Sequence, residues 1–161
     1  MFYYNQYIRA KSLEEAYELY QKRQNFIVGG MLWTKMKNTT LGTAIDLCEL
    51  GLDSIEENEN EFRIGAYVSL RDIETNESLN KYTDNAFANS VKDIVGVQFR
   101  NVATVGGSIW GRYGFSDVMT IFRALGAKVE LFHEGIMELD DFVKLPRTMR
   151  DILVSVIVPK E

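Results

Sequence analysis

The sequence is poor in the side chains from which disulfides and metal centres are built. Among its 161 residues it has one cysteine, Cys48, and one histidine, His133. A single cysteine excludes an internal disulfide and fits a reducing compartment, while one histidine without a cysteine pair excludes the common zinc and iron–sulfur ligand sets. We therefore expect no metal site, a buried apolar role for Cys48 and a surface position for His133.

The sequence also lacks an excess of positive charge and long apolar runs. It has 18 Lys and Arg against 23 Asp and Glu, which gives a formal net charge of −5. This balance argues against a nucleic-acid partner, because phosphate contacts need a basic face. No apolar run is long enough to span a bilayer, and the N-terminal stretch MFYYNQYIRAKS has no apolar signal-peptide core. We expect a cytoplasmic protein that binds neither nucleic acid nor membrane.

The remaining composition is that of a folded α+β protein. Hydrophobic residues make up 46% and aromatic residues 12% of the chain, which contains no repeat or low-complexity run. Apolar spacing and N-cap residues predict helices over 13–22, 68–74, 84–94 and 116–125, with one helical turn at 140–143. Strands or extended segments are predicted over 2–8, 26–28, 43–47, 54–57, 61–65, 128–132, 136–139 and 152–158. We expect a small βαβ lobe over residues 1–53 and a larger lobe over 54–161, with a mixed sheet and helices, which together form one domain.

Two glycine pairs that follow apolar stretches are the strongest functional signal. Gly29-Gly30 comes directly after the strand predicted at 26–28, and Gly106-Gly107 follows a β-branched run that is also expected to be a strand. Glycine permits positive φ and close approach to the backbone, so successive N–H groups can bind an anion. Neither stretch has the Gly-Lys-Ser/Thr of a Walker loop or the G-x-G-x-x-G of a Rossmann fold. We expect the two loops to face each other and clamp one phosphate-bearing cofactor; the alternative is two ordinary turns.

The second glycine stretch carries a family resemblance. Residues 99–109, FRNVATVGGSI, resemble the "iRN-vATvGGni" signature of the FAD-binding (medium) subunits of molybdenum hydroxylases, the xanthine dehydrogenase and carbon monoxide dehydrogenase group. Residues 114–117, GFSD, and 26–30, FIVGG, followed by Met36-Lys37, resemble two further segments of that family, and the likeness covers nearly the whole chain. The resemblance implies FAD as cofactor and a two-lobed FAD-binding fold of the vanillyl-alcohol-oxidase (PCMH) type. The GFSD variant is similar to the purine-hydroxylase branch.

The resemblance also implies a set of cofactor contacts. The two glycine loops would hold the pyrophosphate of FAD mainly through backbone amides, with hydroxyl hydrogen bonds from Thr104 and Ser108. Asp117 would contact the flavin nucleotide, or alternatively only stabilise the first turn of the helix that follows Ser116. Ile94 lies where the family often has an apolar contact to the cofactor. The expected cofactor-binding residues are Ile27, Val28, Gly29, Gly30, Met31, Leu32, Trp33, Ala103, Thr104, Gly106, Gly107, Ser108 and Asp117.

The function implied by the resemblance is electron transfer within a multi-subunit oxidoreductase. A molybdenum-cofactor subunit would oxidise the substrate, iron–sulfur clusters in another subunit would relay electrons, and FAD would pass them to NAD or another acceptor. The flavin carries that chemistry, so we expect no catalytic acid or base in this chain. Trp110, Tyr113 and Phe115 are expected either against the cofactor or in the core. Arg112 is expected as an exposed arginine at a subunit interface, or alternatively against the phosphates.

Two departures from the family pattern leave other functions open. Met31 and Leu32 stand where the family usually has a polar pair, so two side-chain hydrogen bonds to the cofactor are lost. The family usually continues with a C-terminal domain, whereas this sequence ends at Glu161, either as a truncated chain or as a naturally short subunit. One alternative is therefore a degenerate assembly subunit without redox work. Another is an enzyme that binds a different ADP-containing ligand in the same clamp.

Overall fold

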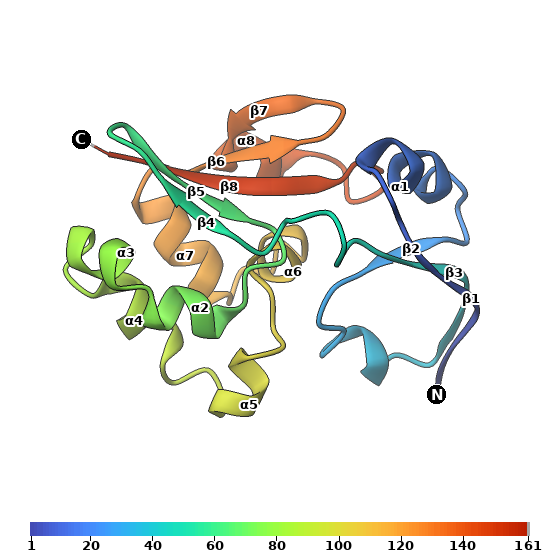
Figure 1. Cartoon of the computed structure of the whole chain (residues 1–161). Coiled ribbons are helices and arrows are strands. Elements are labelled where there is room, and N and C mark those ends of the chain that lie inside the picture. The colour runs from blue at the N-terminus through green and yellow to red at the C-terminus, as the bar shows by residue number, and fades with distance from the viewer. Residues whose placement is uncertain (161) are drawn as a thin grey trace.

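The computed structural model describes residues 1–160, which form two β-sheets flanked by short helices (Figure 1). The N-terminal sheet is parallel and has the strand order β1-β3-β2. Its strands are β1 (Phe2–Arg9), β2 (Phe26–Val28) and β3 (Thr39–Asp46), joined by α1 (Leu13–Tyr20) and the 3-10 helix η1 (Thr34–Met36). Because the strands are parallel, the residues that follow β2 emerge at the carboxyl edge of the sheet, where α/β proteins place their ligand sites.

The larger sheet has the order β4-β5-β8-β6-β7, and every neighbouring pair is antiparallel. Its strands are β4 (Ile55–Glu57), β5 (Glu61–Gly65), β6 (Lys128–Leu131), β7 (Gly135–Glu138) and β8 (Leu153–Pro159). The last strand therefore lies between two hairpins that are far apart in the chain. The α+β class is confirmed, although this sheet is antiparallel throughout and not mixed.

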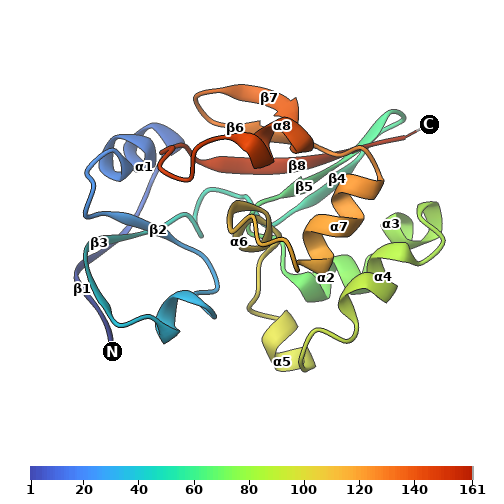
Figure 2. The same ribbon diagram turned by 180° about the vertical axis from the view of Figure 1, so that it is seen from behind.

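Short helices cover the larger sheet and enclose the main core (Figure 2). They are α2 (Leu70–Thr75), α3 (Glu77–Tyr82), α4 (Ala86–Val91), α5 (Val97–Arg100), α6 (Val105–Trp110), α7 (Asp117–Ala124) and α8 (Leu139–Lys144). Phe87 of α4 and Phe122 of α7 pack edge-to-face, with ring centroids 5.0 Å apart, and both are fully buried. The core thus fixes α4 and α7 against each other over the strands beneath them.

A second, smaller core joins the two sheets. It contains Ile45 and Leu47 from the end of β3, Tyr20 from α1, and Ile152 from the segment before β8. The boundary predicted between residues 53 and 54 lies in the connection between β3 and β4. Since Ile152 packs with the N-terminal residues, the two lobes share apolar contacts, and the boundary stays a prediction.

Several local predictions need correction. The helix predicted over 84–94 is limited to α4, because Asp84 and Asn85 adopt positive φ (50° and 61°) and form a turn before it. The residues before Gly106 form no strand; instead α6 begins at Val105 and contains the glycine pair in its first turn. Cys48 is exposed, not buried, because it lies in the turn that follows β3. His133 is exposed, as predicted.

Candidate functional site

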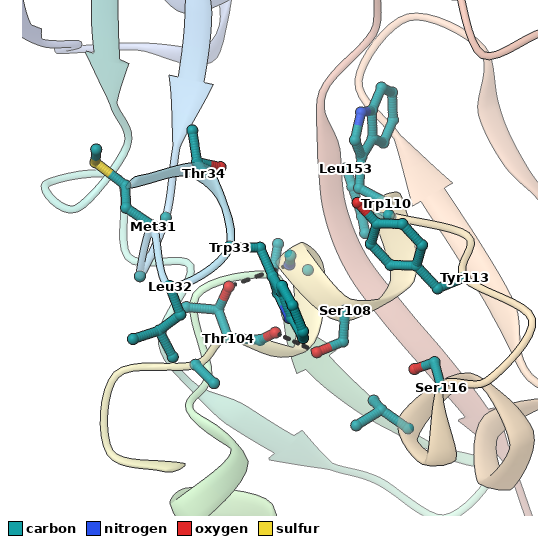
Figure 3. A pocket seen from close by; sticks show the side chains of 18 of the residues that line it. Met31, Leu32, Trp33, Thr34, Thr104, Ser108, Trp110, Tyr113, Ser116 and Leu153 are labelled. Carbon is teal, nitrogen blue, oxygen red and sulfur yellow. Dashed lines mark hydrogen bonds between the residues drawn. The ribbon is translucent and has the colours of Figure 1, made fainter. Parts of the chain in front are cut away.

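A cavity of ≈ 470 Å³ lies between the N-terminal sheet and α6, and both glycine loops line it. We call it the cleft. Figure 3 shows Met31, Leu32 and Thr34 on one side of the cleft and Trp110, Tyr113 and Ser116 on the other, with Thr104 and Ser108 between them. Most of the residues that the sequence resemblance nominated therefore surround a common space, although the two groups are about 70 residues apart in the chain.

The two loops are in direct contact. A Cβ atom on Gly30 would lie 1.9 Å from the carbonyl oxygen of Val102, which is far inside van der Waals contact. A Cβ atom on Gly29 would lie 3.1 Å from the hydroxyl oxygen of Thr104. The loops thus face each other, and the absence of a side chain at Gly30 is what allows the backbone of the first loop to approach the residues before α6.

The first loop offers unpaired backbone donors to the cleft. The N–H groups of Gly30, Met31, Leu32 and Trp33 donate to no acceptor within residues 1–160. Met31 is held at φ 57°, a left-handed conformation that is costly for a residue with a side chain and is found in anion-binding backbone nests. The loop is therefore suited to bind an anionic group through main-chain atoms, and the apolar side chains of Met31 and Leu32 do not prevent this.

The second loop uses most of its amides internally. The N–H groups of Val105 and Gly106 donate to the carbonyl oxygens of Val68 (2.9 Å) and Ala66 (2.8 Å), and the N–H of Gly107 donates to the Thr104 hydroxyl (3.1 Å). Gly106 has a packing role, since a Cβ atom there would lie 2.6 Å from the carbonyl oxygen of Ala66. What this loop leaves available is the hydroxyl hydrogen of Thr104 and the hydroxyl oxygen of Ser108, whose proton goes to the Thr104 carbonyl.

Most, but not all, of the nominated residues line the cleft. Ile27, Trp33, Ala103 and Asp117 do so, and Asp117 is exposed at the first position of α7. Val28 does not; it is buried, and its carbonyl oxygen accepts a hydrogen bond from the Tyr67 hydroxyl. The roles of these residues toward a cofactor stay predictions.

Sequence reasoning missed Tyr67 and Leu153, which also line the cleft. The Tyr67 hydroxyl donates to the carbonyl oxygen of Val28 and accepts from the N–H of Leu47 (3.0 Å). A residue after β5 thus holds the C-terminal ends of β2 and β3 together. Burial raises the pKa of Tyr67 well above its ordinary value, which keeps the hydroxyl protonated. A lone tyrosine between two apolar segments carries no sequence signal for this contact, because it depends on a strand pairing distant in the chain.

Arg112 differs most from its prediction. It is 7% exposed and lines the cleft, whereas the sequence analysis favoured an exposed interface arginine. Its guanidinium lies 4.2 Å from the centroid of the Phe142 ring, and Nη1 donates to the Leu145 carbonyl oxygen at 2.6 Å. Burial, and then the nearby Arg147, hold the pKa of Arg112 below its ordinary value.

Comparison with known proteins identifies the fold and the cofactor. The sequence model of the family described as "FAD binding domain in molybdopterin dehydrogenase" matches residues 3–161. The chain belongs to this family. FAD is the cofactor of the family, and the chain is an FAD-binding domain of the kind found in molybdenum hydroxylases. Both glycine loops, the cleft and its free amides lie within the matched range.

Individual relatives are similar to this chain over nearly its whole length. The chain is 25% identical over 156 residues to the uncharacterized protein YgfM of Escherichia coli K12, covering 93% of this chain and 59% of that protein. Carbon monoxide dehydrogenase from Hydrogenophaga pseudoflava matches 97% of this chain and 59% of its own, with a TM-score of 0.85 and 22% identity. Quinoline 2-oxidoreductase from Pseudomonas putida 86 matches 95% of this chain and 58% of its own, with a TM-score of 0.84 and 20% identity. The chain thus spans less than two thirds of each, and the structural matches establish the fold.

Within residues 1–160, no helix has both the length and the apolar character needed to cross a bilayer.

Proposed function

We propose that the cleft binds FAD and that the chain transfers electrons as the flavin domain of a molybdenum hydroxylase. Electrons would come from a partner subunit with iron–sulfur clusters, which receives them from a molybdenum-cofactor subunit, and would leave to NAD or another acceptor. The observation that carries the proposal is the row of unpaired amides at residues 30–33, in a loop that lines the cleft and is in contact with the loop of Thr104. A xanthine- or purine-type substrate for the complex and a cytoplasmic location belong to the same proposal.

The residues of the cleft fit the parts of FAD. The free N–H groups of the first loop and the Thr104 hydroxyl supply donors for the pyrophosphate, and the Gly29 and Gly107 positions keep the backbone accessible. The Asp117 carboxylate is an acceptor suited to a ribose hydroxyl or an amine. The apolar walls, which include Ile94 and Leu153, suit the flat ring systems and exclude water. When bound, the flavin supplies two-electron redox chemistry, and the protein supplies binding and orientation.

A second candidate function rests on Met31 and Leu32. Both side chains line the cleft, and neither can replace the hydrogen bonds of the polar pair that is usual at these positions. A degenerate assembly subunit without redox activity, or a domain for another ADP-containing ligand, would retain the same fold and the same amides. Both candidates predict weaker binding of FAD than the main proposal does.

Titration of the purified chain with FAD, followed by its visible spectrum and fluorescence, tests the proposal. We expect saturable binding that ADP competes for only weakly. Gly107→Val adds a branched side chain beside Thr104 at the start of α6 and should raise the dissociation constant of FAD at least about tenfold. Gly114→Val is the matched control, because a Cβ atom there meets nothing within 4 Å.

The outcomes separate the candidates. Binding only after an iron–sulfur partner is added would mean that the site is completed in the complex. Equal affinity for ADP and FAD would favour the domain for another ADP-containing ligand. Absence of FAD binding with and without the partner would refute the flavin proposal and leave the assembly subunit.

A further inference from the structure

Two arginines, Arg112 and Arg147, lie together on one wall of the cleft. The guanidinium of Arg147 donates from Nη1 to the carbonyl oxygen of Gly111 (3.0 Å) and from Nη2 to that of Arg112 (2.9 Å). Arg112 donates from Nη1 to Leu145. Within residues 1–160, neither arginine forms an ion pair with a carboxylate. We call the two residues the arginine corner.

Arg112 retains unused hydrogen-bonding capacity in a desolvated position. Its Nε–H has no hydrogen-bond partner, and it is the only buried side-chain nitrogen or oxygen within residues 1–160 in that situation. A guanidinium has five N–H donors, and burying a charged donor without a partner costs free energy. The like charge of Arg147 adds to this cost, as the lowered pKa of Arg112 indicates. Arg112, a buried cation with a spare donor beside the exposed Arg147, is therefore more stable with an anion bound.

Within residues 1–160, neither of the two acids that line the cleft forms an ion pair with these arginines. Asp151 also lines the cleft, but its carboxylate accepts from the backbone N–H groups of His133 (3.0 Å), Glu134 (2.9 Å) and Ile152 (2.7 Å). Asp117 lines the cleft without an ion pair to either arginine. The third nearby arginine, Arg150, donates to carbonyl oxygens of the N-terminal lobe and adds positive charge to this region.

The corner is separate from the glycine loops. Arg112 follows the C-terminal end of α6, whereas Gly106 and Gly107 are in its first turn. At 1.5 Å per residue, six residues place the two ends about 9 Å apart. An anion held by the arginines is thus a second anchor point in the cleft.

We propose that Arg112 and Arg147 form an oxyanion subsite in the cleft, which binds a phosphate-type group. The planar guanidinium forks match the oxygens of phosphate in geometry and charge. The phosphate belongs either to the nucleotide held in the cleft or to a separate phosphate ligand. In the first case the inference rests on the proposed function; in the second it is independent of it.

Binding of inorganic phosphate to the full chain tests the subsite. Thermal unfolding and titration calorimetry are run at constant ionic strength, with chloride replacing phosphate as reference. We expect a saturable rise in Tm with phosphate beyond that with chloride. Arg147→Gln should raise the dissociation constant of phosphate about tenfold or more, through loss of charge-assisted hydrogen bonds.

Two variants control for structural effects, since Arg147 also holds the C-terminal end of α6. Arg147→Lys keeps the positive charge but loses the planar guanidinium. It should therefore weaken phosphate binding less than Arg147→Gln does. Arg123→Gln removes the same charge from an exposed pair with Asp140 outside the cleft and should leave phosphate binding unchanged. A purely structural role would lower the Tm of the Arg147 variants while leaving the phosphate dissociation constant at the original value, which would overturn the proposal.

The same titration at saturating FAD separates the two sources of phosphate. Loss of the phosphate effect assigns the subsite to a phosphate of the bound nucleotide, and persistence assigns it to a separate ligand. A phosphate effect absent from the original chain, or equal in Arg147→Gln and Arg123→Gln, contradicts the subsite. The phosphate titration without FAD is independent of whether FAD binds, and the flavin spectrum reports separately whether the FAD arm reaches saturation.

Discussion

At Gly30 the structure leaves no room for a side chain. The close approach to the Val102 carbonyl makes the contact between the loops depend on the missing methyl group. The unpaired amides that follow depend in turn on that contact for their position. The position of the free amides in the cleft therefore depends on glycine at residue 30.

We expect Gly30→Ala to destabilise the domain by about 1–3 kcal/mol, because the added Cβ displaces backbone and not a flexible side chain. FAD affinity should fall with it, since the first loop must shift away from Val102. Urea unfolding and an FAD titration measure the two effects. Gly114→Ala, in open space, should change neither by more than about 0.5 kcal/mol; equal behaviour of the two variants would contradict this account.

Tyr67 holds the N-terminal sheet by its hydroxyl. Tyr67→Phe removes the donor to Val28 and the acceptor for Leu47, which leaves two backbone groups without their partner. We expect a loss of about 1–3 kcal/mol in the free energy of unfolding, with the aromatic packing retained. Denaturant unfolding checks the value. Tyr3→Phe, on an exposed side chain of β1, serves as control, and a loss of the same size there would speak against a specific role of Tyr67.

At the scale of elements, an ion pair connects two helices at the edge of the cleft. Glu74 of α2 accepts hydrogen bonds from Nε (2.8 Å) and Nη2 (3.2 Å) of Arg100 in α5. The side chain of Arg100 is 6% exposed, and its Nη1 donates to the carbonyl oxygen of Ile94, which lines the cleft. The pair therefore positions the residues that lead into the second loop.

We expect Glu74→Gln to cost about 3 kcal/mol, because it leaves the buried charge of Arg100 without its partner. Hydrogen bonding to Arg100 lowers the pKa of Glu74 from its ordinary value of 4.5. A lowered folded-state pKa contributes stability that is present above pH 4.5 and is lost as the pH falls below it. The stability difference between the two proteins should therefore narrow in acid, as measured by denaturant unfolding at several pH values.

Glu138→Gln provides the comparison, because Glu138 forms only an exposed pair with Lys128 at 3.5 Å. Its cost should stay below about 1 kcal/mol. A constant difference between Glu74→Gln and the original protein across the acid range would mean that the pair does not carry the pH dependence.

At the scale of the whole molecule, Arg150 bridges the two lobes. It comes just before β8 and donates to the carbonyl oxygens of Tyr20 (2.6 Å), Lys22 (3.1 Å) and Asn25 (2.7 Å) in the N-terminal lobe. Its guanidinium also lies 4.0 Å from the centroid of the Tyr20 ring. Since the cleft lies between the lobes, this bridge and the shared core at Ile152 set its width.

We expect Arg150→Ala to loosen the N-terminal lobe and raise the dissociation constant of FAD several-fold. Hydrogen exchange of residues 20–28 should become faster, because the carbonyl groups of Tyr20, Lys22 and Asn25 lose their donor, while exchange in the core strands of the larger sheet stays slow. Arg123→Ala, which removes an exposed arginine, is the control. Uniformly faster exchange throughout the chain would instead indicate global destabilisation.

The sequence by itself determined the α+β class, most strands and caps, and the two glycine loops. These follow from local chemistry: Ser69 caps α2 and forms a capping box with Asp72, and apolar alternation marks β5 and β6. It also carried the family signature at 99–109 and hence FAD.

Only the tertiary structure decided what each of these residues does. Gly106 and Gly30 serve close packing, the amides of the second loop are already paired, and Arg112 is buried beside Arg147. Each of these facts depends on contacts between segments distant in the chain, such as Gly30 with Val102 or Gly106 with Ala66. Local propensity has no information about such contacts, because the partner that satisfies or buries a group is fixed only when the lobes pack together.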